Sequence, residues 1–136
     1  MWVDETEKKW EREEAQRRRE YEAKRTESLK LLVVPDELGD DEKAAWEVGA
    51  AMLRAKDRII KLVDLELLRQ FGRLRVMADR AYTEWNKNPE RFSKIVTGIA
   101  SDKMTPKVTI KENEHYIIFT ESNKELENIM KHMGVL

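Results

Sequence analysis

The residues of this chain best suited to chemistry are arginines clustered near its N-terminus. Arg17, Arg18 and Arg19 are consecutive, and Lys24 and Arg25 follow them closely. Guanidinium groups hold phosphate through paired hydrogen bonds, so this cluster is suited to contact a nucleic-acid backbone. Glutamates flank the cluster on both sides, however. A solvated helix laced by ion pairs is therefore the alternative interpretation.

A second basic row lies on the segment 64–85. Arg69, Arg73 and Arg80 recur at helical spacing with Arg75 beside them, and only Asp79 interrupts the positive charge locally. Such a face predicts either a contact with DNA phosphates or a contact between subunits. The two clusters together are the candidate DNA-binding residues.

Patterns typical of catalysis or metal binding are missing from the sequence. The chain has no cysteine, which excludes thiol catalysis and thiolate metal sites. His115 and His132 do not have the spacing of a metal-ligand pair, and the five glycines are isolated, so they form no phosphate-binding loop. The acidic run 40–42 is interpreted as a helix cap. We therefore expect a binding protein, with no enzymatic activity, cofactor or metal.

Helices must position these residues, and the first is predicted to be a charged arm. Residues 4 to about 32 carry nine acidic and nine basic side chains and no glycine or proline. Acid-first pairs at four-residue spacing, such as Glu20 with Lys24, stabilise a helix by about 0.2–0.5 kcal/mol each. A helix this polar cannot bury itself. Either it extends into solvent or it packs through Trp10 and Tyr21 onto another copy. Because Trp2 and Trp10 have no core to enter on such an arm, they indicate an intermolecular partner or a flexible end.

The segment from Asp64 to Trp85 is predicted to be the central helix of a small domain. Its apolar residues recur at steps of three and four, at Leu67, Leu68, Phe71, Leu74, Ala78, Ala81, Tyr82 and Trp85. Asp64 is placed to cap its start. Gly72 costs about 1 kcal/mol relative to alanine in mid-helix, so we expect another backbone to pass close to it. A second helix is predicted from Asp40 or Asp41 to about Ala55.

The remaining segments are predicted to hold a β-hairpin between two short helices. Asn88-Pro89 begins a short helix through Val96, and the capping box Ser122–Glu125 begins the last helix, which Gly134 ends. Between them, residues 106–111 alternate with period two and 116–119 form a second apolar run. Two strands alone are marginal in water, so the hairpin must lie on the helices or pair with a neighbouring subunit. The candidate oligomerisation residues are Trp10, Tyr21, Val108, Ile110, Tyr116 and Ile118.

The composition and charge of the chain limit the class of protein that these elements can form. The chain has 136 residues, of which 39% are charged, a mean hydropathy of -0.73 and a net charge of -1, so attraction to nucleic acid must come from local patches. No stretch approaches the roughly 20 apolar residues of a membrane span, and we expect a soluble protein of the cytoplasm. The fold class predicted is mainly α with a small β-hairpin. It comprises a long charged helical arm (1–32), a compact helical core (33–105), and the hairpin with the C-terminal helix (106–136).

The order of motifs over residues 34–136 resembles the small terminase subunit of tailed double-stranded DNA bacteriophages. The similarity runs through Pro35-x-x-Leu38, Ala44-Ala45-Trp46, Met52-Leu53, the Asp64 helix start with Leu67 and Phe71, Ala81-Tyr82-x-x-Trp85, and the close from Leu126 to Leu136. The resemblance implies a non-catalytic packaging factor in the host cytoplasm. Such a factor forms a ring of several subunits, recognises viral double-stranded DNA and presents it to the large terminase subunit. Members of the family commonly begin with a basic tail rich in glycine and proline, where this chain has a balanced helical arm.

Two other functions fit the same sequence. The first is a dimeric helical DNA-binding transcription regulator with a helix-turn-helix in residues 40–85, although residues 56–63 are long and apolar for its turn. The second is a structural scaffold without a DNA role. The arm lacks the sustained heptads of a coiled coil, which counts against a scaffold. In all three interpretations the monomer completes its apolar surface by joining other copies, because the hairpin is too small to stand free and the arm carries exposed aromatic rings.

Overall fold

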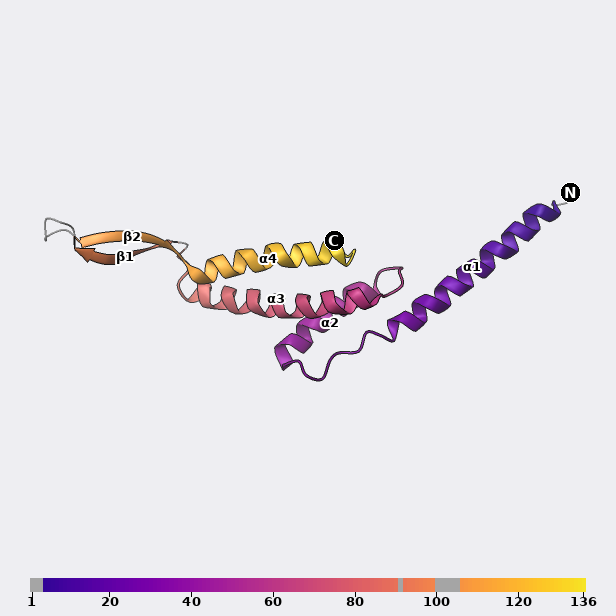
Figure 1. Cartoon of the computed structure of the whole chain (residues 1–136), viewed down its shortest axis with the longest axis horizontal. Helices are drawn as coiled ribbons and strands as arrows, with labels where there is room; N and C mark the ends of the chain where they lie inside the picture. Colours follow the sequence, from indigo (N-terminus) through magenta and orange to yellow (C-terminus); the bar gives the residue numbers. More distant parts are fainter. Residues whose placement is uncertain (1–3, 91, 100–105) are drawn as a thin grey trace.

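The computed structural model describes residues 4–90, 92–99 and 106–136, with segments 93–99 and 106–110 described by their backbone alone. It confirms a mainly helical chain. The elements are α1 (Glu5–Leu29), α2 (Asp40–Arg54), α3 (Leu62–Lys87), β1 (Phe92–Ile99), β2 (Pro106–Glu112) and α4 (Glu114–His132). Figure 1 shows an elongated molecule in which α1 extends from one end, α2, α3 and α4 pack in the middle, and the two strands extend from the other end.

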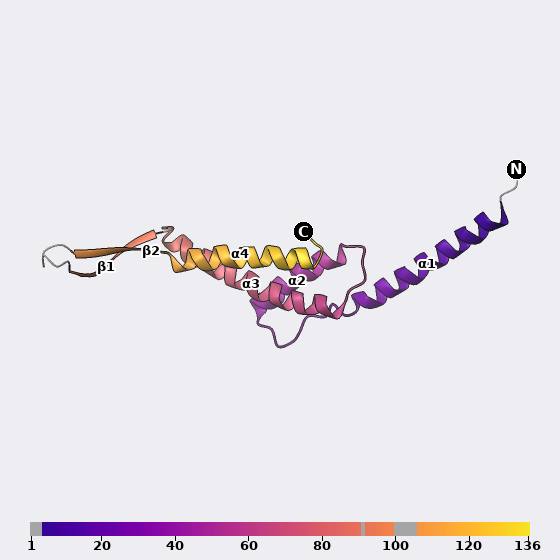
Figure 2. The same cartoon turned by 45° about the horizontal axis from the view of Figure 1, so that its top comes forward.

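The core lies where α3 packs between α2 and α4, an arrangement that is also visible after rotation (Figure 2). Trp46 and Leu53 of α2 are buried against Leu68 and Phe71 of α3, and Met133 closes the core after α4. These residues repeat at helical spacing, and each buried side chain of this size contributes about 1.5–3 kcal/mol relative to exposure. The predicted central helix is confirmed, since α3 extends two residues beyond each end of the segment 64–85.

The predicted close approach at Gly72 is confirmed. A Cβ atom built on Gly72 would lie 3.3 Å from the backbone oxygen of Glu42 and 3.5 Å from the backbone nitrogen of Trp46. The two helices also meet at Gly49, where a Cβ atom would lie 2.7 Å from Cδ2 of Leu68. The absence of side chains at these two positions lets α2 and α3 approach at backbone distance.

The predicted helix caps need correction. α2 begins at Asp40 with Gly39 in the cap position, so the aspartates lie in the first turn, where negative charge favours the helix dipole. α3 begins at Leu62, and Asp64 is its third residue instead of its cap. There the Asp64 carboxylate accepts the N–H of Lys61 at 2.8 Å, as the third residue of a capping box does.

The predicted elements between residues 88 and 122 are partly wrong. The segment expected to form a short helix up to Val96 forms β1, which pairs antiparallel with β2 in a register that places Ile95 opposite Thr109. β1 is rich in β-branched residues, which fit a pleated strand. The first predicted strand thus lies within β2, but its partner precedes it in the chain. The predicted domain boundary at residue 105 falls between the two paired strands.

The second predicted strand, 116–119, forms the first turns of α4. Asn113 caps this helix, with its Oδ1 accepting the N–H of His115 at 2.9 Å. Ser122, expected to cap the last helix, is buried within α4. The predicted end of that helix is confirmed, because Gly134 has a φ of 72° in the left-handed region that glycine favours. Within the described residues, no helix is long and apolar enough to cross a membrane.

Candidate nucleic-acid and subunit interface

The base of the arm is held by the connector between α2 and α3, residues 55–61. The guanidinium of Arg25 donates to the carbonyl oxygens of Lys56 at 2.9 Å and of Arg54 at 3.2 Å, and its Nε lies 3.5 Å from the Asp57 carboxylate. These contacts satisfy two carbonyls at the C-terminal end of α2, where a positive charge is favourable. Arg25, predicted as a DNA contact, is therefore engaged inside the chain.

Two further residues of α1 bind the same connector. The hydroxyl of Tyr21 donates to the Asp57 carbonyl oxygen at 3.1 Å, and Oγ of the buried Ser28 accepts the N–H of Ile60 at 2.9 Å. The N-terminal part of α1 leads away from the core (Figure 1). The last two turns of α1 therefore fix the direction in which the first five turns extend.

The other basic residues of the arm are exposed. Nη2 of Arg17 lies 3.1 Å from Glu14, a pair three residues apart on the helix surface. Such exposed pairs contribute little to stability, because solvent screens them. Arg18, Arg19 and Lys24 form no ion pair with any residue in the described part of the chain. Their side chains are free to bind an external anion.

The basic row on α3 is divided. Arg69 pairs with Glu37 at 2.9 Å and Arg80 lies 3.7 Å from Asp41, so both are turned toward the segment around the start of α2. Arg73 and Arg75 are exposed and form no ion pair with the residues that the structure describes. Arg69 and Arg80 therefore have carboxylate partners on the surface of the chain, and the contact of this row with DNA or with another subunit stays a prediction.

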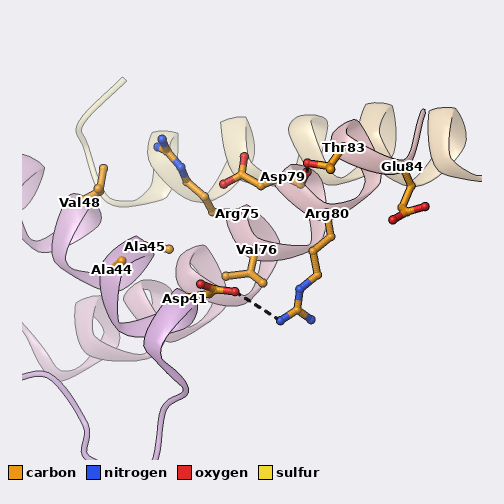
Figure 3. Close-up of a pocket in the computed structure, with 10 residues that line it drawn as sticks. All are labelled: Asp41, Ala44, Ala45, Val48, Arg75, Val76, Asp79, Arg80, Thr83 and Glu84. Atoms are coloured by element: carbon orange, nitrogen blue, oxygen red, sulfur yellow. Dashed lines mark hydrogen bonds and ion pairs between the residues drawn. The ribbon is translucent and has the colours of Figure 1, made fainter. Parts of the chain in front are cut away.

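A groove between α2 and α3 collects several of these groups (Figure 3). Arg75 and Arg80 border it, but so do the carboxylates of Asp41, Asp79 and Glu84. In Figure 3 the Arg80 side chain points toward Asp41, while the Arg75 side chain points to the opposite side. Three carboxylates against two guanidiniums disfavour a phosphate there, so the groove is a poorer anion site than the arm.

A buried ion pair that the sequence interpretation missed joins three elements. Arg58 donates to both carboxylate oxygens of Asp64 at 2.7 and 3.0 Å, and its Nη2 also donates to the Met133 carbonyl oxygen at 2.7 Å. Burial alone raises the pKa of Asp64, but the hydrogen bonds from Arg58 and Lys61 and their positive charges outweigh it, so the pKa lies below its usual 3.8. The only signal in the sequence was the break in apolar pattern at Lys56-Asp57-Arg58.

The candidate oligomerisation residues fall into three groups. Trp10 and Tyr21 are 60% and 38% exposed on the arm, and Ile118 is exposed on α4. Tyr116 is not on a strand but packs on Trp85, with ring centroids 5.3 Å apart, in a cluster completed by Tyr82 and Phe119. The side chains of Val108 and Ile110 lie outside the described part of the structure, as does Trp2.

No group of three His, Asp or Glu side chains among the described residues is arranged to hold a metal ion. Nδ1 of His132 lies 2.7 Å from the carbonyl oxygen of Asn128 in its own helix. Comparison of the chain with models of protein families, with characterised proteins and with solved structures finds no match. Function is therefore inferred from the residues themselves.

Proposed function

We propose that the protein is a non-catalytic factor that binds double-stranded DNA as an assembly of several copies, in the manner of a phage small terminase subunit. The single observation that carries this proposal is the exposed basic half of α1. Residues 16–30 hold six basic and three acidic side chains, and residues 4–15 hold three basic and six acidic ones. The arm is neutral as a whole but has a positive half of about three charges, next to the core.

The geometry of this half suits a phosphate backbone. Arg17, Arg18 and Arg19 are consecutive on a helix, so their side chains spread around its circumference and are exposed on several sides. The arm extends from the core, so a duplex can approach it without meeting α2 or α4 (Figure 1). Each arm offers only a few phosphate contacts, which alone give weak binding, but several arms on one assembly multiply them through effective concentration.

Self-association is supported by what the monomer leaves unpaired. β1 and β2 pair only with each other among the described strands, and the two-stranded ribbon lies beyond the helices (Figure 2). Free strand edges and an isolated ribbon are stabilised by pairing with another chain. Val108 and Ile110 belong to β2, and we propose that this ribbon pairs with a neighbouring subunit and so closes a ring.

In this proposal the ring binds viral DNA in the cytoplasm of the host and passes it to the large terminase subunit. The chain supplies no chemistry of its own, because the ATPase and nuclease of packaging belong to that partner. Its contribution is to hold DNA by many weak contacts that can exchange as the duplex moves.

The test compares two triple variants that remove equal charge from the same helix. R17Q/R18Q/R19Q removes three positive charges from the basic half, and K8Q/K9Q/R12Q removes three from the acidic half. We measure binding to duplex DNA across a salt series. Each phosphate contact contributes about 0.9 to the slope of log K against log salt, so the first variant should bind more weakly and with a flatter slope. The second should resemble the native chain.

The outcomes separate the functions. Equal affinity in the native chain and the first variant would move DNA binding away from the arm and overturn the proposal. Native mass measurement supports the packaging function if the assembly contains many copies, and a dimer that binds DNA favours a transcription regulator instead. An assembly that does not bind DNA at low salt would be a scaffold.

A further inference from the structure

The exposed part of α1 carries a stripe whose charges reverse about its centre. Glu7, Trp10, Glu14, Arg17, Tyr21 and Lys24 follow one another at steps of three and four, so they share one face of the helix. Read from the N-terminus the stripe is acid, aromatic, acid, then base, aromatic, base. Reading it backwards gives the same order with every charge inverted.

We propose that the arms of two copies pair antiparallel along this stripe. Placing Trp10 of one copy on Tyr21 of the other sets Glu14 against Arg17 and Glu7 against Lys24, because the residue numbers of each facing pair add to 31. Two-fold symmetry makes each contact occur twice. This two-fold contact joins copies in pairs and is therefore distinct from the strand contact proposed above to close a ring; it rests on the self-association proposed there.

The parallel arrangement is disfavoured by the same charges. Two parallel arms in register would set Glu14 on Glu14 and Arg17 on Arg17, so each like charge would meet its copy. Sliding the antiparallel pair by one heptad places Trp10 against Glu14 or against Ser28, which is already buried. On the flanks, Glu11 meets Arg18 and Glu13 meets Glu20, so one attractive contact and one repulsive contact offset each other.

The surface around Tyr21 is hollowed. A shallow hollow of about 430 Å³ is lined by Glu14, Arg17, Arg18, Tyr21, Glu22 and Asp57. The Tyr21 ring forms one wall and is held in place by its hydrogen bond to the Asp57 carbonyl oxygen. Trp10, 60% exposed on its own arm, is the side chain that the antiparallel register brings to this hollow. Two aromatic pairs contribute about 0.5–1.5 kcal/mol each beyond their buried area.

The size of the seam sets the strength of the contact. Residues 7–24 span about 26 Å of helix, and the seam contains no aliphatic side chain. Exposed ion pairs of this kind contribute about 0.2–1 kcal/mol each and are screened by salt. The arms therefore pair weakly unless other contacts raise their local concentration, and the pairing weakens as salt increases.

Cysteine cross-linking on the full chain tests the register, since the native chain has no cysteine. The variants W10C and Y21C are prepared separately and oxidised mildly, alone and mixed. Antiparallel pairing predicts that the mixture forms a disulfide about tenfold faster than either variant alone, because only unlike positions face each other. Faster self-linking of W10C, or equal rates in all three samples, would overturn the proposal.

A charge exchange tests the seam with the aromatic residues intact. The acidic variant R17E/K24E and the basic variant E7K/E14R each place like charges across the seam, so each should lose arm pairing alone. Their mixture restores every attractive contact and should regain it, measured by energy transfer between dyes on the two variants. If the wild-type chain assembles and binds DNA but the W10C and Y21C variants do not cross-link with each other, the arm pairing alone is overturned. A chain that is monomeric and does not bind DNA would overturn both proposals.

Discussion

Replacing Arg58 by methionine should destabilise the fold more than any comparable change at a surface arginine. Arg58 spans the start of α3 and the end of α4, because its guanidinium binds both Asp64 oxygens and the Met133 carbonyl oxygen. The side chain of Asp64 is only 3% exposed, whereas that of Arg58 is 29% exposed. Methionine keeps most of the length and the apolar stem but removes the charge and the hydrogen bonds to Asp64 and Met133.

The magnitude follows from what remains after the change. Asp64 would be left buried with only the N–H of Lys61 as partner, and breaking a buried pair in this way costs about 3–5 kcal/mol. Loss of the bond to the Met133 carbonyl adds about 1 kcal/mol, while the partial exposure of Arg58 lets water offset some of the loss. We therefore expect a total of about 4 kcal/mol, a large fraction of the roughly 5–15 kcal/mol that stabilises a typical domain.

The assay is urea unfolding followed by tryptophan fluorescence at one fixed protein concentration. The matched control is R69M, because Arg69 pairs with Glu37 at 2.9 Å but both side chains are about half exposed. That exposed pair is worth less than about 1 kcal/mol. A double variant, R58M/D64N, should recover part of the stability lost in R58M, since it removes the unpaired buried charge. Equal losses in R58M and R69M would refute the reasoning.

The pH dependence gives a second check on the same pair. Arg58 holds the folded-state pKa of Asp64 below 3.8, so the stabilisation is fully present above about pH 4 and is lost as the pH falls through the folded pKa. In R58M, burial is no longer outweighed and raises that pKa. The deficit of R58M relative to the native chain should therefore shrink as the pH is lowered from 7 toward 4. A deficit that is constant over this range would show that Asp64 is not the group involved.

Two further stability changes follow from the packing. G49A should destabilise more than G72A, because the new Cβ would lie 2.7 Å from the buried Leu68 side chain in the first case and 3.3 Å from the Glu42 backbone in the second. Overpacking costs about 1–3 kcal/mol, and the higher helix propensity of alanine offsets about 1 kcal/mol of this cost. The order of the two variants is read from their urea midpoints. W85F should leave stability within about 1 kcal/mol of the native value in thermal unfolding. The indole N–H of Trp85 is buried without a partner among the described residues, so its removal offsets the smaller ring. A loss above about 3 kcal/mol would mean that this N–H is bonded.

The helices that the sequence predicted well are those whose information is local. In α2 and α3 the apolar residues recur at helical spacing, and Gly72 in mid-helix predicted a backbone contact that the structure confirms. The periodicity of apolar residues shows which face of a helix is buried, and a glycine in mid-helix indicates that another backbone lies close to it. Neither needs knowledge of the rest of the fold.

The segment 113–119 shows what local information cannot decide. Its apolar run has a composition typical of a strand, but Asn113 caps a helix there, and Tyr116 and Phe119 both reach Trp85 on α3. Three residues separate the two rings, one turn of a helix, whereas in a strand they would lie on opposite faces. Packing against α3 therefore overrides β propensity, and only the tertiary contact identifies the correct period.

The candidate site shows a similar division. The basic residues were found from type and spacing, but which of them are free depends on partners far along the chain. Arg25 is taken up by the connector 55–61, and Arg69 and Arg80 by carboxylates before and at the start of α2. Arg58 was missed because its partner Asp64 lies six residues away, a spacing that suggests no contact in any regular element.

The charge division of α1 has a simpler explanation than pairing, and the aromatic residues decide between them. Acidic residues early in a helix and basic residues late in it stabilise an isolated helix through its dipole. Alanine would serve such a helix better than Trp10 or Tyr21, since aromatic residues have lower helix propensity by about 0.5 kcal/mol. An exposed indole on an isolated helix also buries no apolar surface unless a partner covers it. The dipole thus accounts for the acidic first turn of α1, whose last turn holds no basic residue, whereas pairing accounts for the charges of the stripe, both rings and the distance between them.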